Sequence, residues 1–288
     1  MQKNSRKRKL IWILGSIAIL IVAVIIFFLI PYSPVSREFQ RDVQMHTEQS
    51  VIREGVFTEQ DIAHLPEALQ NHFRAAGIIG QPIMSRASIH VPSAAIFQSS
   101  DSSPMILDYT LYLFGHRPVR LAYINTSMFG IPFEAFDSFQ EGEGFMRGVI
   151  GKVFTLFNQT GAEMDRGQLL TYLGEVFLIP SAIFNGHITW ETIGTNHVRA
   201  TIIYGELSGS GIFTFGNDGF VQSFHTDERA RIDTDGSIDF PEWSAVFDGW
   251  VRSENGMYIP RNFKAVWHEP DGDFVYFEPT SGFYIVFH

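Results

Sequence analysis

The sequence predicts an α+β protein, in which an N-terminal transmembrane helix precedes a large curved antiparallel sheet. We expect this sheet to be a half-barrel-like meander covered on one side by a few helices. Three observations predict it: an unbroken apolar run over residues 10–30, period-two alternation of apolar residues in much of the chain beyond residue 82, and turn dipeptides such as Asn-Gly and Asp-Gly between the alternating runs.

The apolar run from Leu10 to Ile30 contains no charged residue. About 20 apolar residues, each rising roughly 1.5 Å along a helix, cross a hydrocarbon core of about 30 Å. A cleavable signal peptide usually has an apolar region of about 7 to 15 residues and then a small-residue cleavage site, and residues 31–34 offer none. The run therefore predicts a membrane anchor.

The charge around the anchor predicts its orientation. Residues 1–9 hold five Lys and Arg and no acidic residue, so the positive-inside rule places the N-terminus in the cytoplasm. The predicted organisation is a cytoplasmic basic tail over 1–9, a single transmembrane helix over 10–30 in the cell membrane, a linker or stalk over 31–55, and an extracytoplasmic β-rich domain over 56–288.

Composition restricts the possible partners. Outside the basic tail the chain has 16 of its 21 Lys and Arg residues and all 31 Asp and Glu residues. This excess of acidic residues argues against nucleic acid as a partner. The chain has no Cys, which removes disulfides, thiol nucleophiles and thiolate metal sites. An exported protein without disulfides suits a bacterial envelope.

Local patterns predict the order of elements. The run Thr58-Glu59-Gln60-Asp61 resembles a capping box and predicts a helix that ends near Gly77, with a break at Pro66. Strands are predicted between 82 and 136, and helical spacing predicts two helices, over 146–157 and 169–177. The remainder is predicted to be a meander, with hairpin turns at 217–219, 235–236, 255–256 and 271–272.

No catalytic constellation, cofactor motif or metal motif is evident, because the sequence contains neither H-E-x-x-H nor G-x-S-x-G. We therefore predict no catalytic residue and no cofactor, and we favour a protein that is not an enzyme. One weak alternative is a calcium loop formed by Asp233, Asp235, Asp239 and Glu242. Arg231 occupies the leading position of that loop, where a carboxylate is needed, so an acidic hairpin turn is the favoured interpretation.

The 27 Phe residues of this acidic chain suggest a cavity between sheet and helices that holds an apolar or lipid-like ligand, or a partner segment. The predicted wall residues are Met128, Phe129, Phe154, Phe157, Phe177 and Trp190. Two alternatives stay open. One is an envelope hydrolase that uses carboxylates such as Asp165 and Glu175. The other is a structural or sensory ectodomain that binds an envelope partner, with Trp190, Asp227 and Arg229 in an exposed patch or a buried ion pair.

Several motifs occur in a characteristic order: Leu65-Pro66-Glu67-Ala68, Met128-Phe129-Gly130-Ile131-Pro132, Gly142-Glu143-Gly144-Phe145-Met146, Leu170-Thr171-Tyr172-Leu173-Gly174-Glu175, Ile188-Thr189-Trp190-Glu191 and Asp227-Glu228-Arg229. As a set, over about residues 56–278, they resemble the bacterial proteins of domain of unknown function 6544.

The resemblance implies a membrane-anchored or exported protein with no assigned activity, and it marks Glu175, Glu191, Asp227 and Arg229 as possible functional polar residues. The order of elements is also similar to the half-barrels of periplasmic lipoprotein carriers, which hold apolar ligands between a sheet and its helices. That second likeness is an architectural analogy.

Overall fold

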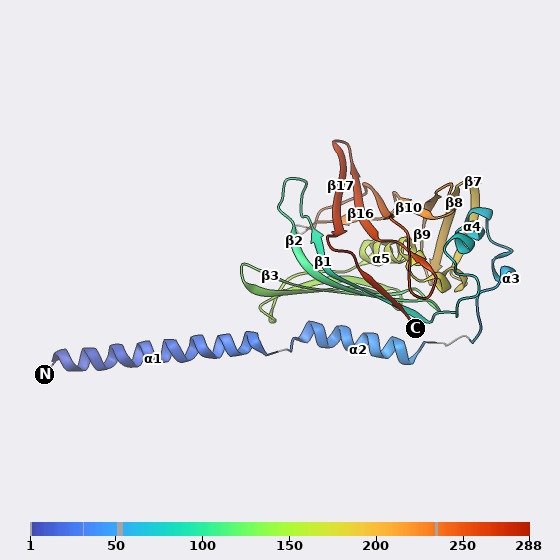
Figure 1. Ribbon diagram of the computed structural model, residues 1–288. Coiled ribbons are helices and arrows are strands. Elements are labelled where there is room, and N and C mark those ends of the chain that lie inside the picture. The colour runs from blue at the N-terminus through green and yellow to red at the C-terminus, as the bar shows by residue number, and fades with distance from the viewer. Residues whose placement is uncertain (1, 31, 51–53, 234–235) are drawn as a thin grey trace.

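The computed structural model describes residues 2–30, 32–50, 54–233 and 236–288, with side chains from residue 7 onward. Helix α1 (Gln2–Leu29) extends away from the body of the molecule (Figure 1). Within the described part of the chain it is the one helix long and apolar enough to cross a membrane, and the side chains of its apolar stretch are almost all exposed. Its 28 residues span about 42 Å.

The body is one open antiparallel sheet, which comprises fourteen strands among the described residues. Most of these strands pair with a neighbour in the sequence. The order across the sheet is β6-β5-β4-β3-β2-β1-β17-β16-β13-β10-β9-β8-β7, and β18 also pairs with β1. The strands are β1 (Arg86–Ile96), β2 (Met105–Phe114), β3 (Val119–Met128), β4 (Ile131–Gln140), β5 (Glu143–Ile150), β6 (Phe154–Gln159), β7 (Ile188–Gly194), β8 (His197–Tyr204), β9 (Leu207–Phe215), β10 (Val221–Thr226), β13 (Glu242–Asp248), β16 (Asn262–Glu269), β17 (Gly272–Pro279) and β18 (Tyr284–Phe287).

Two small ribbons lie outside this sheet. They are β11 (Arg231–Ile232) with β12 (Ile238–Asp239), and β14 (Val251–Arg252) with β15 (Tyr258–Ile259). The predicted turns at 217–219, 255–256 and 271–272 each join two antiparallel strands. The turn predicted at 235–236 includes residue 235, which lies outside the described residues. The predicted α+β class and the antiparallel meander are therefore confirmed.

Helix α5 (Ala162–Gly174) lies inside the curve of the sheet (Figure 1). It is buried on all sides over residues 167–174, as a helix enclosed by a sheet must be. Two glycines allow the close approach: a Cβ on Gly144 of β5 would lie 2.7 Å from the carbonyl oxygen of Met164, and one on Gly209 of β9 would lie 2.7 Å from Cδ2 of Leu170.

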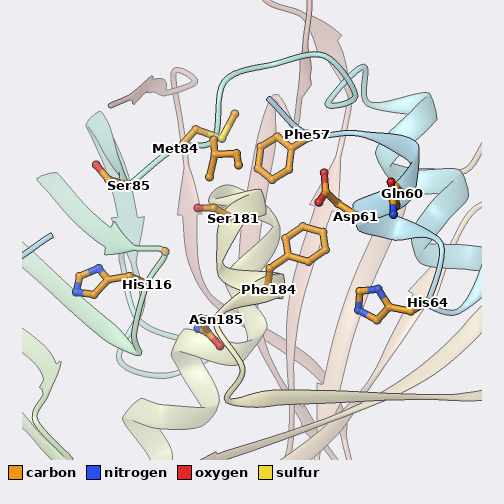
Figure 2. Close-up of a pocket in the computed structure, with 12 residues that line it drawn as sticks. Phe57, Gln60, Asp61, His64, Met84, Ser85, His116, Ser181, Phe184 and Asn185 are labelled. Atoms are coloured by element: carbon orange, nitrogen blue, oxygen red, sulfur yellow. The ribbon is translucent and has the colours of Figure 1, made fainter. Parts of the chain in front are cut away.

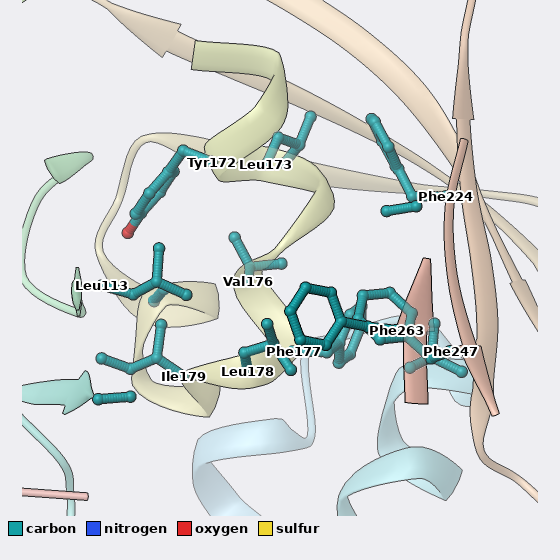
Figure 3. Close-up of a cluster of buried hydrophobic side chains, with 14 of the residues drawn as sticks. Leu113, Tyr172, Leu173, Val176, Phe177, Leu178, Ile179, Phe224, Phe247 and Phe263 are labelled. Carbon is teal, nitrogen blue, oxygen red and sulfur yellow. The ribbon is translucent and has the colours of Figure 1, made fainter. Parts of the chain in front are cut away.

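After α5, two 3₁₀ turns, η1 (Val176–Leu178) and η2 (Pro180–Phe184), continue the buried segment. Their apolar side chains fill the space below α5 (Figure 3). Helices α3 (Glu59–Ile62) and α4 (Glu67–Ala75) occur where the capping box and Pro66 predict them. Thr58 and Asp61 cap each other's backbone N–H groups, as the box requires.

The helix predicted over 146–157 is wrong, because these residues form β5, a turn and β6. Their three- and four-residue apolar spacing arises from a register shift between Gly148 and Val149 and from the turn that follows Ile150. A bulge adds one residue to the alternation of a strand, which can imitate helical spacing.

A second difference lies in the predicted linker, where Pro34–Glu48 form helix α2. Ser33 caps its N-terminus by accepting a hydrogen bond from the backbone N–H of Ser36, and Pro34 occupies the first turn. The helix buries Val35, Phe39, Asp42 and His46 at intervals of three and four residues. The sequence did not reveal this buried stripe, because two of its four residues, Asp42 and His46, are polar.

Helix α2 packs on the outer face of the sheet, opposite α5. It contacts β3 and β4, where the outward side chains of alternate residues form a small separate core with Val35 and Phe39. The ring of Phe39 stacks on Tyr123 at 5.2 Å and meets Phe136 edge-on at 5.6 Å. The sheet is thus covered by α5 on its concave face and, in part, by α2 on the other.

We predict that Phe39→Ala lowers the free energy of unfolding by about 3 kcal/mol, because it leaves a cavity in this small core. The measurement is thermal or denaturant unfolding of the full chain in detergent. Met45→Ala, on the exposed side of α2, is the matched control and is expected to change it by less than about 0.5 kcal/mol. Equal effects of the two substitutions would show that α2 is not packed on the sheet.

Candidate functional site

The candidate site is a cavity of about 230 Å³ between α5 and the concave face of the sheet. Its apolar and aromatic walls come mainly from β1, β3, β13, β16 and β17. Its polar side chains come from β3, β4, α5 and the segment after β10. The polar group comprises Arg120, Asp137, Gln168, Thr171, Glu175 and Arg229, and Tyr109, Ile124, Trp243, Phe247, Trp267 and Tyr276 are among the wall residues.

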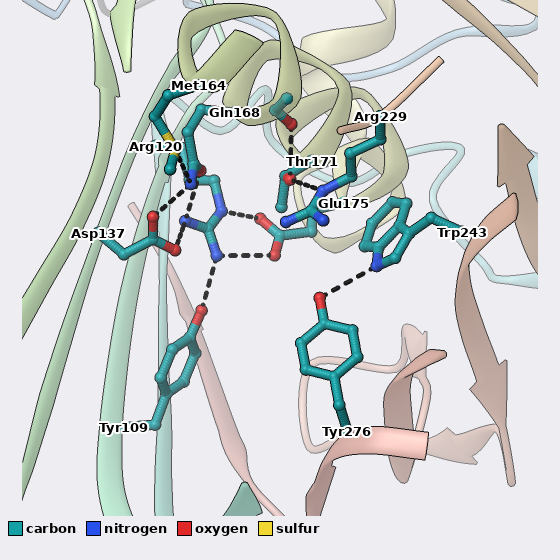
Figure 4. A network of polar contacts seen from close by, with 11 residues as sticks. Tyr109, Arg120, Asp137, Met164, Gln168, Thr171, Glu175, Arg229, Trp243 and Tyr276 are labelled. Carbon is teal, nitrogen blue, oxygen red and sulfur yellow. Dashed lines mark hydrogen bonds and ion pairs between the residues drawn. The ribbon is translucent and has the colours of Figure 1, made fainter. Parts of the chain in front are cut away.

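Arg120 lies at the centre of a buried polar network (Figure 4). Its Nε donates to Glu175 Oε2 at 2.8 Å, Nη2 donates to Glu175 Oε1 at 3.2 Å and to the Tyr109 hydroxyl at 2.9 Å, and Nη1 donates to Asp137 Oδ2 at 2.6 Å and to Gln168 Oε1 at 3.3 Å. A guanidinium has five N–H donors, so every one of them is used. Arg120 therefore has no donor left for a ligand.

Burial and charge act in opposition in this network. Burial raises the pKa of Glu175, while the neighbouring charge of Arg120 opposes that rise. Burial alone would lower the pKa of Arg120, but the charges of Glu175 and Asp137 outweigh it and raise that pKa. Burial also raises the pKa of Tyr109, so its hydroxyl stays protonated. The network, in which one guanidinium holds two carboxylates, is a structural element that connects the α5 segment to β2, β3 and β4.

Arg229 lies on the opposite wall in a different environment. Its guanidinium lies over both indole rings, 4.8 Å from the centre of Trp243 and 4.9 Å from that of Trp267, which are paired neighbours on β13 and β16. Nε donates to the hydroxyl of Thr171 at 2.9 Å, and Thr171 donates in turn to the carbonyl of Gly167 at 2.9 Å. These contacts orient the guanidinium, since a cation is attracted to the face of an indole ring.

The terminal nitrogens of Arg229 have no hydrogen-bond partner among the described residues, and the side chain is only partly buried. Arg120 and Arg231 are engaged, since Arg231 pairs with Asp239 and Glu269. Lys264 lies between Phe263 and Ala265 on β16, whose side chains face the cavity, so its own side chain faces the other side of the sheet, 3.5 Å from Glu278. Arg229 is therefore the cationic group in this cavity with donors available to an acceptor from outside.

None of the six predicted wall residues lines this cavity, and they separate into three groups. Phe177 and Trp190 pack against Phe213 in the core below α5. Met128 and Phe157 are partly buried at the core's edge. Phe129 and Phe154 are 98% and 69% exposed, in two hairpins near the end of α1.

The four predicted polar residues also separate. Glu175 and Arg229 line the cavity, as described above. Glu191 is exposed and pairs with Arg199 at 3.2 Å, and Asp227 is exposed. Sequence reasoning missed Arg120, Trp243 and Trp267. The sequence offered one indication of Arg120. It shares a face of its strand with the apolar residues Ala122 and Ile124, so a charged side chain is expected on a buried face.

The weak calcium-loop residues diverge as well. Asp239 pairs with Arg231 at 2.6 Å, and the cation in the leading position thus has a carboxylate partner. Asp233 lies in the turn of the β11–β12 ribbon, where its backbone N–H donates to Ser237, and Asp235 lies outside the described residues. Glu242 contacts His225 at 3.0 Å on β10 instead. The carboxylates that the structure describes do not converge.

The carboxylates of the hydrolase alternative are also apart. Asp165 accepts a hydrogen bond from the backbone N–H of Gly144 at 2.7 Å, near the first turn of α5. Glu175 follows the last turn, ten residues later, and a helix rises about 15 Å over that interval. The two carboxylates therefore lie at opposite ends of α5, and each has its own partner, Gly144 for Asp165 and Arg120 for Glu175.

A second cavity of about 360 Å³ lies between residues 57–64 and the start of the sheet (Figure 2). It includes Ser181, whose buried hydroxyl has no partner among the described residues, and His116, whose pKa burial lowers to about 4. Figure 2 shows polar side chains on opposite sides, with Ser85 and His116 on one side, Asp61 and His64 on the other and Ser181 between them, and they do not point to a common centre. We therefore place the candidate site in the first cavity, where polar groups converge.

We predict that Glu175→Gln lowers the free energy of unfolding by about 3 kcal/mol, because it removes one partner of a buried ion pair. The matched control is Glu191→Gln, which removes the exposed partner of Arg199 and is expected to cost less than about 1 kcal/mol. Denaturant unfolding of both variants in detergent checks this. Similar losses in the two variants would contradict a structural role for the Arg120 network.

Comparison with known proteins adds one match. The model of a protein family described as a family of unknown function (DUF6544) matches residues 55–279, which include the whole cavity. No curated protein matches the chain.

Proposed function

The chain belongs to the family of unknown function DUF6544, and we propose that it is a membrane-anchored extracytoplasmic domain without enzymatic activity that binds a lipid-like amphiphile in the cavity under α5. The ligand class is an apolar chain with an acidic head group. The observation that carries the proposal is Arg229, a cation held over Trp243 and Trp267 with unengaged donors at an aromatic-walled cavity.

The chemistry of the walls supports an amphiphile. A guanidinium with two free terminal nitrogens matches a carboxylate or phosphate, which accepts paired hydrogen bonds. Ile124, Phe247 and Phe263 offer apolar surface farther along the same cavity. The cavity is smaller than the roughly 300–1,000 Å³ typical of drug-sized sites, so it suits the head group and the first part of a chain.

The acidic residues of the cavity support binding over hydrolysis. Glu175 and Asp137 are both held by Arg120, at 2.8 and 2.6 Å, and neither has a geometry in which it can serve as a free acid or base. Acid–base catalysis by two carboxylates requires both of them to reach the same bond. With Asp137 and Glu175 held by Arg120, Glu163 is the one remaining acidic residue of the described lining, so this cavity provides a single free cation and no pair of free carboxylates.

We predict that a photoreactive fatty acid cross-links to the peptides that carry Trp243 and Trp267 in the full chain reconstituted in liposomes. Arg229→Gln should reduce that cross-linking about tenfold at limiting probe, equivalent to a loss of about 1.4 kcal/mol, because one charge-assisted contact is removed. A photoreactive alcohol of the same chain length should be affected much less.

The control variant is Arg199→Gln, which changes an exposed arginine of β8 that does not line the cavity. It should leave the yield unchanged. Cross-links confined to α1, or equal yields in Arg229→Gln and the unchanged chain, would reject the cavity as the binding site.

The structure also supports a position for the body against the membrane. Lys152, in the turn between β5 and β6, donates to the carbonyls of Phe27, Phe28 and Ile30 at 3.3, 3.1 and 2.6 Å. These carbonyls belong to the C-terminal end of α1, where a cation is favourable. If α1 spans the bilayer, this turn is held where the helix emerges.

The surface next to that contact is apolar. The hairpin tips of β3–β4 and β5–β6 expose Phe129, Ile131, Val153, Phe154 and Leu156. The two tips are neighbours, since a Cβ on Gly151 would touch both Ile131 and Phe28. Figure 1 shows the β3 end of the sheet beside the end of α1. Exposed aromatic residues at this level fit the interfacial region of a bilayer.

We predict that both tips enter the membrane interface. Because the chain has no Cys, Phe129→Cys and Phe154→Cys each give a single attachment site for a nitroxide label. In liposomes, labels at both positions should be more accessible to dissolved oxygen than to a water-soluble paramagnetic complex. Ile203→Cys, an exposed apolar position on β8, is the control and should show the reverse. Water-like values at 129 and 154 would instead favour a protein partner for this surface.

A further inference from the structure

A cluster of two histidines and a glutamate lies on the face of the sheet opposite the cavity. His225, Glu242 and His268 belong to the adjacent strands β10, β13 and β16. His225 follows Phe224, Glu242 precedes Trp243 and His268 follows Trp267, and these three aromatic neighbours face inward. Because side chains alternate along a strand, His225, Glu242 and His268 point outward together. They are separated by up to 43 residues in sequence, so no local motif reveals them.

The ligand atoms of the three side chains converge. One ligand atom from each lies within 4.8 Å of the others. Nδ1 of His225 is 3.0 Å from Glu242 Oε1, and Nε2 of His268 is 4.0 Å from the same oxygen. The buried hydroxyl of Ser244 lies 2.7 Å from Nδ1 of His225 and 2.6 Å from Nε2 of His268, so both nitrogens are directed at this hydroxyl, beside Glu242.

A second layer of hydrogen bonds orients the rings. Asp273 on β17 lies 2.6 Å from Nδ1 of His268. A carboxylate only accepts, so this nitrogen carries the proton and Nε2 presents its lone pair to the cluster. Ser223 lies 2.8 Å from Nε2 of His225 and can accept a hydrogen bond from Nε2–H, which leaves the lone pair of Nδ1 free to coordinate. Metal-binding histidines characteristically have such partners on the other ring nitrogen.

We propose that His225, Glu242 and His268 bind a first-row divalent transition metal ion of the Zn²⁺ type. Two imidazoles and one carboxylate are a preferred ligand set for such ions, with a water molecule in the fourth position. With metal–ligand distances of about 2.1 Å, tetrahedral geometry separates ligand atoms by about 3.4 Å. The two ring nitrogens lie 3.0 and 4.0 Å from the Glu242 oxygen, which brackets that value, and all three ligand atoms lie within 4.8 Å of one another, so rotation of these partly exposed side chains is needed to bring them together.

Binding requires no net loss of protons from neutral histidines. Without the ion, Nδ1–H of His225 donates to Glu242, since that oxygen can only accept. On binding, the ring proton resides on Nε2 and is donated to Ser223. The two tautomers have the same charge, and the ion takes the place of two internal hydrogen bonds, from Nδ1–H of His225 to Glu242 and from the Ser244 hydroxyl to Nε2 of His268.

The experiment is a titration of the untagged full chain in detergent with Zn²⁺, together with the absorption spectrum of the Co²⁺ complex. We expect one ion per chain, a higher unfolding temperature with Zn²⁺, and a Co²⁺ spectrum typical of four-coordination. His225→Gln and His268→Gln should each weaken Zn²⁺ binding at least tenfold and abolish the Co²⁺ spectrum. Asp273→Asn should weaken binding about 10- to 100-fold, because it removes an orienting partner.

His90→Gln is the matched control, because His90 forms an exposed pair with Asp108 at 2.8 Å. This pair does not belong to a three-residue group among the described residues. The control should bind Zn²⁺ like the unchanged chain. The proposal is overturned by the absence of saturable Zn²⁺ binding in the unchanged chain, or by equal losses in His90→Gln and His225→Gln. Neither result depends on whether the cavity binds an amphiphile.

Discussion

The ion pairs of Arg120 are the interaction on which the interior of this protein depends. A helix enclosed by a curved sheet has no solvent face to set its rotation, and apolar contacts alone are nondirectional. Arg120 supplies direction, since its fixed donor geometry engages Glu175 and Gln168 of the α5 segment and Asp137 of β4 at once. A buried ion pair contributes little net stability compared with apolar packing, but removing one partner is costly. Its role is therefore to specify the position of α5, and hence the shape of the cavity that α5 covers.

The cavity and the proposed metal site share their strands. Trp243 and Trp267 face inward beneath Arg229, and the adjacent residues Glu242 and His268 face outward. An ion bound to β10, β13 and β16 would join these strands behind the tryptophan wall. The sheet is open, with β6 and β7 as its two edge strands. An ion bound by three neighbouring inner strands would therefore stabilise their pairing.

The elements that local patterns specify were predictable from sequence. The apolar run of α1, the capping box at Thr58 and the turns at 255–256 and 271–272 are each encoded within a few residues. The strands at 146–157 were not predicted because a bulge shifts the alternation, and α2 was not predicted because two of its four buried residues are polar. In both segments the pattern of buried residues depends on the strand or sheet against which the segment packs, and the local sequence does not show that partner.

The site was predictable only in part, for a related reason. Glu175 and Arg229 belong to motifs that stand out in the sequence, and both line the cavity. The contribution of Trp243 and Trp267 depends on the register between β13 and β16, as does the meeting of His225, Glu242 and His268. Register is determined by long-range pairing, which a single sequence does not display.

Helix α2 and Lys152 together restrict the movement of the body relative to α1. A flexible stalk over 31–55 would let the body move through a large volume, but α2 is packed on β3 and β4, and Lys152 binds the end of α1. Glu38 of α2 also pairs with Arg147 of β5 at 2.5 Å. The contacts of α2 and the contact of Lys152 with the end of α1 thus hold the body next to that end of the helix. β3 contributes Ile124 to the cavity and continues to Met128, beside the exposed Phe129. If α1 spans a membrane and the cavity binds the proposed amphiphile, a domain held in this way is suited to take that molecule from the same membrane and poorly suited to carry it elsewhere.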